Sequence, residues 1–131
     1  MKGLNLNLNH LQDKKTGDWW VYYVFNNNPR EVGYFPKSLF TYLAQKATRI
    51  CFGAIVRSKN ALPTPPMGSG ALPNGGTHAA TFFDLRIIDE DGISIPILIY
   101  LSTTITDEKC HSITTIEHGA CFYGGPAGCI R

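Results

Sequence analysis

The chain has 131 residues, of which 44% are hydrophobic and 17% charged, the composition of one globular domain rather than of a disordered segment. Its 12 basic and 10 acidic residues give a net charge of +2, too balanced for a nucleic-acid or membrane surface. No apolar run reaches the ~18 residues that span a membrane, and the N-terminus lacks the apolar core of a signal peptide. We therefore expect no nucleic-acid partner, no membrane partner and no secretory address in the chain as written.

The N-terminal third predicts two strands joined by a turn. Leucine and asparagine alternate over residues 4–9, the pattern of a half-buried strand. Residues 13–18, DKKTGD, form a polar turn cluster. Residues 19–25, WWVYYVF, are aromatic and β-branched, which favours a second strand.

The next segment predicts one short helix followed by a strand. Pro36 suits the first turn of a helix. Apolar residues at positions 39, 40, 43, 44 and 47 form one helical stripe, so we expect a helix over about residues 36–47. Alternation resumes at residues 49–57 and predicts a strand, in which Ile55 would share a face with Gly53 and Arg57.

The remainder of the chain predicts a long loop and more strands. Residues 59–79 are dense in proline and glycine and predict an irregular loop within one domain. The sequence DEDG at 89–92 predicts a hairpin turn. Pro96 marks an edge or a bulge in its strand. Four further segments carry strand patterns: residues 80–88, 93–105, 112–117 and 120–123.

One helix among six or seven strands predicts a mostly β fold with antiparallel pairing. An antiparallel β-sandwich fits this order of elements better than a closed barrel does.

The four cysteines, at positions 51, 110, 121 and 129, leave three interpretations open. Zinc sites favour closely spaced pairs, and the only such spacing here is His118-x₂-Cys121, so we expect no metal and no cofactor. A nucleophilic Cys–His pair, with His111 or His118, would require two side chains that the spacing does not bring together. In an oxidising compartment, a disulfide among Cys110, Cys121 and Cys129 is the favoured interpretation.

Two groups of carboxylates are candidates for acid–base chemistry. Asp89, Glu90 and Asp91 are adjacent in the predicted turn, and we expect them to be solvated. Glu117 lies beside His118 near the end of a short strand, where a salt bridge at the rim is the simpler interpretation. A catalytic pair of carboxylates must also meet in space.

Six strings of this sequence, in this order, resemble the C-terminal half of the neprosin family of plant proteins. They are KTGDWW (15–20), VGYFPKSLFTYLAQKAT (32–48), FGAIV (52–56), MGSG followed by LP (67–73), the cysteine of TDEKCHSI (106–113) and FYGGPAGC (122–129).

The resemblance implies an antiparallel β-sandwich, of which residues 1–131 would form a single partial domain with a poorly matched extension at 1–14. Characterised members of the family are secreted glutamic peptidases that cleave after proline at acidic pH. Two glutamates face each other across a cleft, and one activates water while the other protonates the substrate. The resemblance also implies a disulfide between Cys110 and Cys129, which leaves Cys51 and Cys121 outside that bond.

The family's W-G-G-E-V string corresponds here to residues 52–56, so Ile55 stands where the family carries a catalytic glutamate. An isoleucine side chain can neither transfer a proton nor orient water. The other family glutamate lies upstream, in a segment that this chain does not contain. Active members also carry a T-I-E string, but Glu117 aligns near the C-terminal strand, so we interpret that match as coincidence.

Three functional hypotheses follow. The first is a truncated neprosin-like domain of a plant protein that lacks peptidase activity and self-associates through open sheet edges. The second is an active prolyl endopeptidase that acts on proline-containing peptides, with Glu117 or an acid at 89–91 as the second carboxylate. The third is a non-catalytic β-sandwich module that binds carbohydrate or peptide through aromatic residues of the second strand, namely Trp19, Trp20, Tyr22 and Tyr23.

Overall fold

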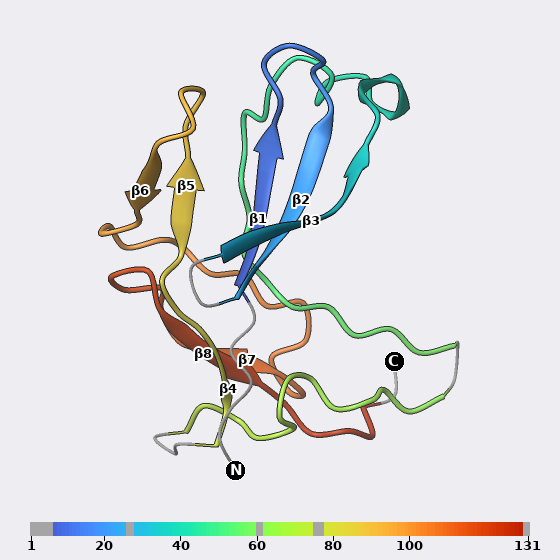
Figure 1. Cartoon of the computed structure of the whole chain (residues 1–131). Coiled ribbons are helices and arrows are strands. Elements are labelled where there is room, and N and C mark those ends of the chain that lie inside the picture. The colour runs from blue at the N-terminus through green and yellow to red at the C-terminus, as the bar shows by residue number, and fades with distance from the viewer. Residues whose placement is uncertain (1–6, 26–27, 60–61, 75–77, 130–131) are drawn as a thin grey trace. The chain divides into compact units, whose positions relative to one another are not determined.

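The regular secondary structure consists almost entirely of short antiparallel strands, joined by turns and irregular segments (Figure 1). The computed structural model describes residues 7–25, 28–59, 62–74 and 78–129. Within these ranges, eight strands form three sheets, with the orders β1-β2-β3, β4-β8-β7 and β5-β6. The strands are β1 (Asn7–Gln12), β2 (Trp19–Phe25), β3 (Asn28–Phe35), β4 (Ala80–Phe82), β5 (Arg86–Ile88), β6 (Ser94–Pro96), β7 (Ser112–Ile113) and β8 (Cys121–Gly124). The mostly β, antiparallel prediction is confirmed, while the sandwich arrangement stays a prediction.

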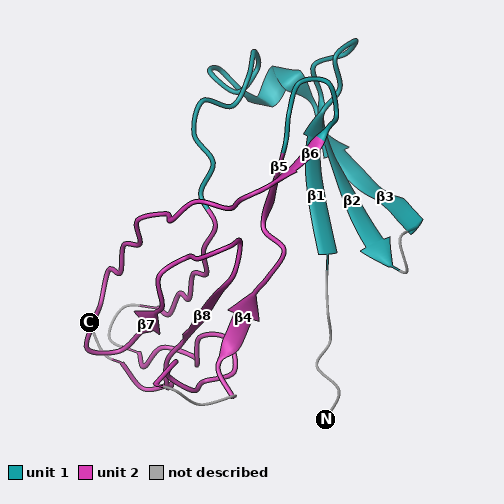
Figure 2. Cartoon of the chain, turned by 90° about the vertical axis from the view of Figure 1, so that its left-hand side faces the viewer, with its two compact units in different colours: residues 1–51, 88–93 teal, residues 52–87, 94–131 magenta. Residues whose placement is uncertain are grey.

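The chain divides into two compact units (Figure 2). Unit 1 comprises residues 1–51 and 88–93, and unit 2 comprises residues 52–87 and 94–131. No helix in the described part of the chain is long and apolar enough to cross a membrane.

Unit 1 is organised around the β1-β2-β3 sheet. Strand β2 pairs with β1 from Gln12↔Trp19 to Asn7↔Val24, and with β3 from Trp19↔Phe35 to Phe25↔Asn28. A bulge interrupts the β2–β3 register between Val21 and Tyr22. The predicted strand at 19–25 is therefore confirmed. Residues 4–6 of the strand predicted at 4–9 lie outside the described ranges, and residues 7–9 belong to β1, which ends at Gln12.

The polar cluster at 13–18 forms the predicted turn between β1 and β2. Asp13 Oδ1 accepts hydrogen bonds from the backbone N–H groups of Lys15 (2.8 Å) and Thr16 (2.7 Å). The Asp13 N–H donates to the Asp18 carbonyl, and the Gly17 N–H donates to the Asp13 carbonyl. These bonds close the hairpin and fix the β1–β2 register.

The helix predicted over residues 36–47 is wrong. The segment contains only a 3₁₀ turn, η1 (Lys37–Leu39), and Phe40 returns to extended backbone with φ −118° and ψ 150°. The Leu43 carbonyl accepts a hydrogen bond from the Trp19 indole N–H (2.8 Å) and another from the Gln12 amide (3.4 Å). These bonds hold the segment against the β1–β2 sheet. The Leu43 carbonyl is thereby bonded to side chains of the sheet and not to a backbone N–H of a helix.

Unit 2 holds every buried apolar side chain of the described residues. Its core consists of Leu85, Ile97, Ile116 and Cys121. Partly buried neighbours pack against this cluster: Phe52, Phe82, Leu101 and Ile113. The rings of Phe82 and Tyr123 stack with centroids 4.6 Å apart. The core therefore joins strands β4 and β8 to the chain around β5, β6 and β7.

Four predicted strands of unit 2 are shorter than expected or absent, and one of them, expected at 112–117, is limited to β7. The strand expected at 49–57 is absent, because only Phe52 of this segment packs against the core and no described strand pairs with it. The strand expected at 80–88 is divided into β4 and β5 at Asp84, which adopts a left-handed φ of 50°. The strand expected at 93–105 is limited to β6, which ends at Pro96, a residue without an N–H for the ladder.

The loop segment at residues 62–70 packs along the C-terminal segment of the chain. Met67 forms an antiparallel bridge with Gly125, with N–H···O distances of 3.0 and 3.3 Å. The Thr64 N–H bonds to the Cys129 carbonyl, and the Gly128 N–H bonds to the Thr64 carbonyl, both at 2.9 Å. This part of the predicted loop is thus held in place by backbone hydrogen bonds.

Candidate functional site

Ile55, the residue expected in place of a catalytic glutamate, lies on an extended segment without strand pairing. Its side chain is 74% exposed, and Gly53 and Arg57 are exposed as well. Phe52 anchors the segment to the unit 2 core. The position therefore offers only an exposed aliphatic side chain, which has no group for proton transfer.

A tight hairpin turn positions Glu117, the other carboxylate singled out from the sequence. Glu117 and Ala120 exchange both backbone hydrogen bonds, at 3.0 and 2.9 Å. The two residues between them have left-handed backbones, with φ 48° at His118 and 71° at Gly119, as a type I′ turn requires. A Cβ atom at Gly119 would lie 3.1 Å from the Leu85 carbonyl oxygen, so this turn needs glycine for space as well as for φ.

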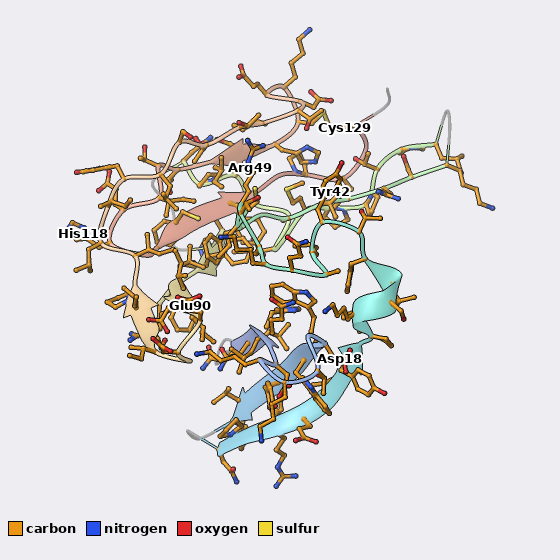
Figure 3. All side chains as sticks on the ribbon, turned by 90° about the horizontal axis from the view of Figure 1, so that it is seen from above. Asp18, Tyr42, Arg49, Glu90, His118 and Cys129 are labelled. Carbon is orange, nitrogen blue, oxygen red and sulfur yellow. A yellow bond between two sulfur atoms is a disulfide. The ribbon has the colours of Figure 1, made fainter. Side chains whose placement is uncertain are left out.

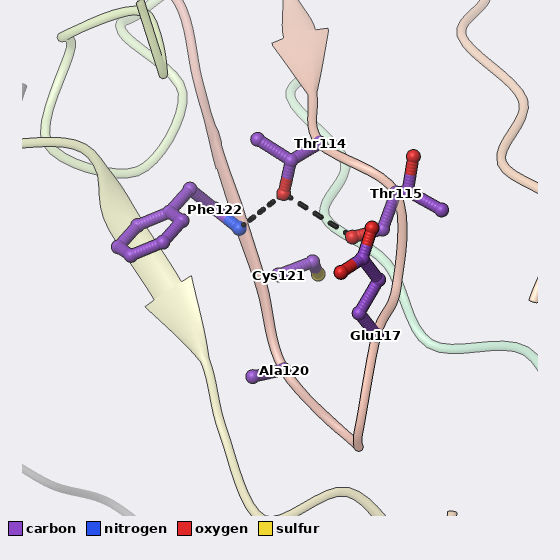
Figure 4. A pocket seen from close by; sticks show the side chains of 6 residues that line it. All are labelled: Thr114, Thr115, Glu117, Ala120, Cys121 and Phe122. Atoms are coloured by element: carbon purple, nitrogen blue, oxygen red, sulfur yellow. Dashed lines mark hydrogen bonds between the residues drawn. The ribbon is translucent and has the colours of Figure 1, made fainter. Parts of the chain in front are cut away.

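This hairpin borders a shallow pocket in unit 2 with a volume of about 370 Å³ (Figure 4). The Thr114 hydroxyl accepts the Phe122 N–H at 3.0 Å and donates to the Thr115 carbonyl at 3.3 Å. Glu117 is the only ionisable carboxyl group among the six lining residues, which are Thr114, Thr115, Glu117, Ala120, Cys121 and Phe122. The Thr114 hydroxyl is therefore engaged within the protein, and the pocket walls contain no second carboxylate with which Glu117 could form an acid–base pair.

The thiol of Cys121 lies at the inner side of this pocket and is only 2% exposed. Burial raises the pKa of the Cys121 thiol, because the thiolate would be poorly solvated, although a backbone hydrogen bond at Phe82 partly opposes the shift. The neutral thiol is a weak nucleophile. Cys121 therefore packs in the core, and its thiol is not activated as a nucleophile.

The predicted disulfide joins Cys110 to Cys129, with Cα atoms 6.1 Å apart, and Cys51 and Cys121 are free thiols. Because disulfide sulfurs are not thiolates, Cys110 and Cys129 cannot be metal ligands while the bond is intact. His118 and Cys129 lie well apart (Figure 3). Among the described residues, no three His, Cys, Asp or Glu side chains converge on a common metal position.

His111, which the sequence placed beside Cys110, is a buried residue of unit 2. Its Nε2 atom has no hydrogen-bond partner among the described residues. Gly125 approaches the imidazole so closely that a Cβ atom there would lie 2.6 Å from His111 Cδ2. Gly125 of the FYGGPAGC string thus makes room for the histidine ring.

The carboxylates at 89–91 belong to the turn between β5 and β6. Asp89 Oδ1 accepts the N–H groups of Asp91 (2.9 Å) and Ile93 (2.8 Å). Asp91 forms an ion pair with Lys14 at 2.7 Å, and this contact lowers the pKa of the Asp91 carboxyl and raises the pKa of the Lys14 amine. Both partners are largely exposed. Asp89 therefore stabilises the turn, and Asp91 forms a surface ion pair.

The aromatic residues of β2 do not form one surface. Alternation along the strand places Trp19 and Tyr23 on one face of the sheet and Trp20 and Tyr22 on the other. The Trp19 indole bonds to the Leu43 carbonyl, so its face is covered by the segment that follows β3. On the other face, the ring of Tyr34 from β3 lies 4.9 Å from the ring of Trp20.

Two residues near these sites were missed by sequence reasoning. Thr114 lines the pocket, but a threonine in a short β segment gives no signal in a single sequence. Tyr34 could not be placed, because the register of Phe25↔Asn28 would bring Gly33 opposite Trp20, and only the bulge brings Tyr34 there. The composition of residues 26–33, NNNPREVG, favours a loop, whereas residues 28–35 form β3.

Comparison with known proteins agrees with the resemblance noted from the sequence strings. The family model described as Neprosin matches residues 2–126, nearly the whole chain. The matched range includes Ile55, Cys110 and Glu117, whereas Cys129 lies just beyond its end. No solved structure matches the chain.

Proposed function

Because the chain belongs to the Neprosin family, we propose that it is a neprosin-type domain without glutamic-peptidase activity. The observation that carries the proposal is the isoleucine at position 55, where the family string W-G-G-E-V has its glutamate. Hydrolysis by a pair of carboxylates requires one group that accepts a proton from water and one that donates a proton to the substrate. Ile55 can do neither.

The alternative, an active peptidase that uses Glu117, is less well supported. Glu117 is exposed at a hairpin turn, and the other five residues that line its pocket carry no carboxylate. A single carboxylate cannot be the base for water and the acid for the leaving group in the same step. The pocket is also shallow, so it would exclude little water from a bound peptide.

The acids of the β5–β6 turn are also poor candidates for the second carboxylate. Asp89 is engaged by two backbone N–H groups and Asp91 by the Lys14 amine. The Lys14 contact lowers the pKa of the Asp91 carboxyl. A general acid would need the opposite environment, one that keeps its proton on at the working pH.

A peptide-cleavage assay tests the proposal. The purified chain and its Glu117→Gln variant are incubated at pH 2 to 5 with peptides that contain proline, and new termini are read by mass spectrometry. We expect neither protein to produce cleavage above the buffer control. Cleavage by the parent chain that is abolished in Glu117→Gln would overturn the proposal and would make Glu117 the catalytic carboxylate.

A further inference from the structure

One face of the β1-β2-β3 sheet brings together aromatic rings and polar groups that lie far apart in the sequence. The Trp20 ring lies 4.9 Å from Tyr34 and 6.3 Å from Tyr22, measured between centroids, with tilts of 32° and 30°. Trp20 and Tyr34 are directly opposite each other in the register, and directly opposite residues of an antiparallel pair share a face. Three rings from two strands therefore form one slightly folded aromatic surface.

Polar side chains flank this surface in the next row of the sheet. The register places Asn9 opposite Tyr22 on one side and Glu31 opposite Tyr22 on the other. Asn9 and Glu31 are exposed, and Tyr34 is 52% exposed. The Trp20 indole N–H and the hydroxyls of Tyr22 and Tyr34 form no hydrogen bond with another described residue, so these donors are available to a ligand.

We propose that this aromatic face, made of Trp20, Tyr22 and Tyr34 with Asn9 and Glu31 beside them, binds an uncharged saccharide. A sugar ring presents C–H groups on its face and hydroxyls at its edge. The C–H face packs on the negatively polarised face of an aromatic ring. The hydroxyls both donate and accept, which matches the amide of Asn9, the ring N–H of Trp20 and the carboxylate of Glu31.

The choice of a saccharide over a proline-rich peptide follows from Glu31. Proline-rich segments also dock on aromatic surfaces, but they expose mainly carbonyl oxygens and have no N–H at proline. An ionised carboxylate only accepts hydrogen bonds, so Glu31 would face peptide acceptors without a partner. A saccharide hydroxyl satisfies it, whereas an acidic saccharide would be repelled by the same charge.

This inference does not depend on the proposed loss of peptidase activity, because the aromatic face belongs to unit 1 whereas Ile55 and Glu117 belong to unit 2. A chain that cleaves peptides could still bind saccharide here. A chain that binds no saccharide could still be catalytically inactive.

Affinity electrophoresis of the full chain tests the inference. Native gels contain hydroxyethyl cellulose as a neutral β-1,4-glucan or polygalacturonate as a charged polymer, at about 0.15 M salt so that the net charge of +2 is screened. We expect the neutral glucan to retard the parent chain and polygalacturonate not to. Tyr34→Ala should weaken retardation by roughly tenfold in apparent affinity, the size of effect typical of an aromatic stacking contact, while Tyr34→Phe should retain it.

Phe25→Ala is the matched control, because Phe25 is an exposed aromatic residue of the same sheet that alternates onto the opposite face. It should be retarded like the parent chain. If Tyr34→Ala fails to fold by circular dichroism, Glu31→Lys replaces it and should lose retardation by the neutral glucan. The inference is overturned by an unretarded parent chain, by equal loss in Phe25→Ala, or by Tyr34-dependent binding of deca-proline or of a second copy in place of the glucan.

Discussion

At the scale of single residues, the four cysteines have three different environments. Cys110 and Cys129 are bonded, Cys51 is exposed, and Cys121 is buried in the unit 2 core. Reactivity follows from these environments, because a thiol reacts through its thiolate and burial raises the pKa of the Cys121 thiol.

We predict that iodoacetamide at pH 7.5 labels Cys51 in the folded chain and leaves Cys121 unmodified. In denaturant without reductant, both should be labelled, because unfolding removes the burial that protects Cys121. Peptide mass spectrometry measures the two sites separately. Labelling of Cys121 as fast as Cys51 under native conditions would contradict the buried environment, and labelling of Cys110 or Cys129 would contradict the disulfide.

The disulfide is expected to contribute strongly to stability. It closes a loop with a sequence separation of 19 residues, for which the chain-entropy estimate gives roughly 3 kcal/mol. We predict that the double variant Cys110→Ser/Cys129→Ser lowers the free energy of unfolding by about this amount in a urea titration. Cys51→Ser provides the control and should change it little. A double variant as stable as the parent chain would show that the bond does not constrain the unfolded state.

At the scale of elements, the turn between β1 and β2 depends on one carboxylate. The N–H groups of Thr16 and Lys15 bond to the Asp13 carboxylate and lower the pKa of Asp13 from its ordinary value of 3.8. A lowered pKa in the folded chain means that the contribution to stability is present above about pH 4. It is lost as the pH falls through the folded-state pKa.

We therefore predict that Asp13→Ala destabilises the chain at pH 6 and that the difference from the parent chain shrinks as the pH falls toward 2. Chemical unfolding at a series of pH values measures this difference. Glu108→Ala, which changes an exposed acid of unit 2, should show no such trend. A difference that grows on acidification would have the wrong sign and would rule out the assigned role of Asp13.

The elements that sequence patterns predicted well are those whose partners lie nearby in the chain. The WWVYYVF strand, the turn at 13–18 and the turn at 89–92 form with neighbouring residues, so local composition suffices. The helix at 36–47 failed because a side chain from β2 takes the Leu43 carbonyl, a contact between residues 24 positions apart. The strand prediction at 49–57 was wrong, because an alternating pattern of apolar residues does not by itself supply a neighbouring strand to pair with.

The candidate sites were predictable to different degrees. The Cys110–Cys129 bond followed from the family resemblance, because spacing alone left three cysteines open. The pocket beside Glu117 could not be predicted, since it requires Thr114 and Cys121 to meet across the β7–β8 pairing. The Tyr34 ring beside Trp20 depends on a register that a bulge shifts by one residue.

At the scale of the whole molecule, the chain exposes many apolar side chains for its size. The segment that follows the β5–β6 turn carries five of them, each at least 48% exposed: Ile93, Ile95, Leu98, Ile99 and Tyr100. No charged residue occurs between positions 93 and 105. Such uncharged, β-prone segments favour association when no other part of a protein covers them.

We predict that the purified chain self-associates, with an apparent mass in size-exclusion chromatography with light scattering that rises with concentration. A double substitution, Leu98→Glu/Ile99→Lys, should shift the distribution toward monomer, because both side chains are more than 60% exposed and their removal leaves the core intact. Val32→Lys, on an exposed position of β3, is the control. A monomer at every concentration, with one sharp unfolding transition, would contradict this prediction.

We propose that this chain, a member of the Neprosin family, carries out no hydrolysis by a pair of carboxylates. The most direct test measures the rate of peptide-bond cleavage after proline by a stoichiometric amount of the chain, in a peptide mixture sampled over a day at pH 2 to 7. A stoichiometric amount of chain and a day of sampling make even slow turnover visible. We expect product levels equal to those in buffer at every pH. A rate above the buffer that rises on acidification would contradict it.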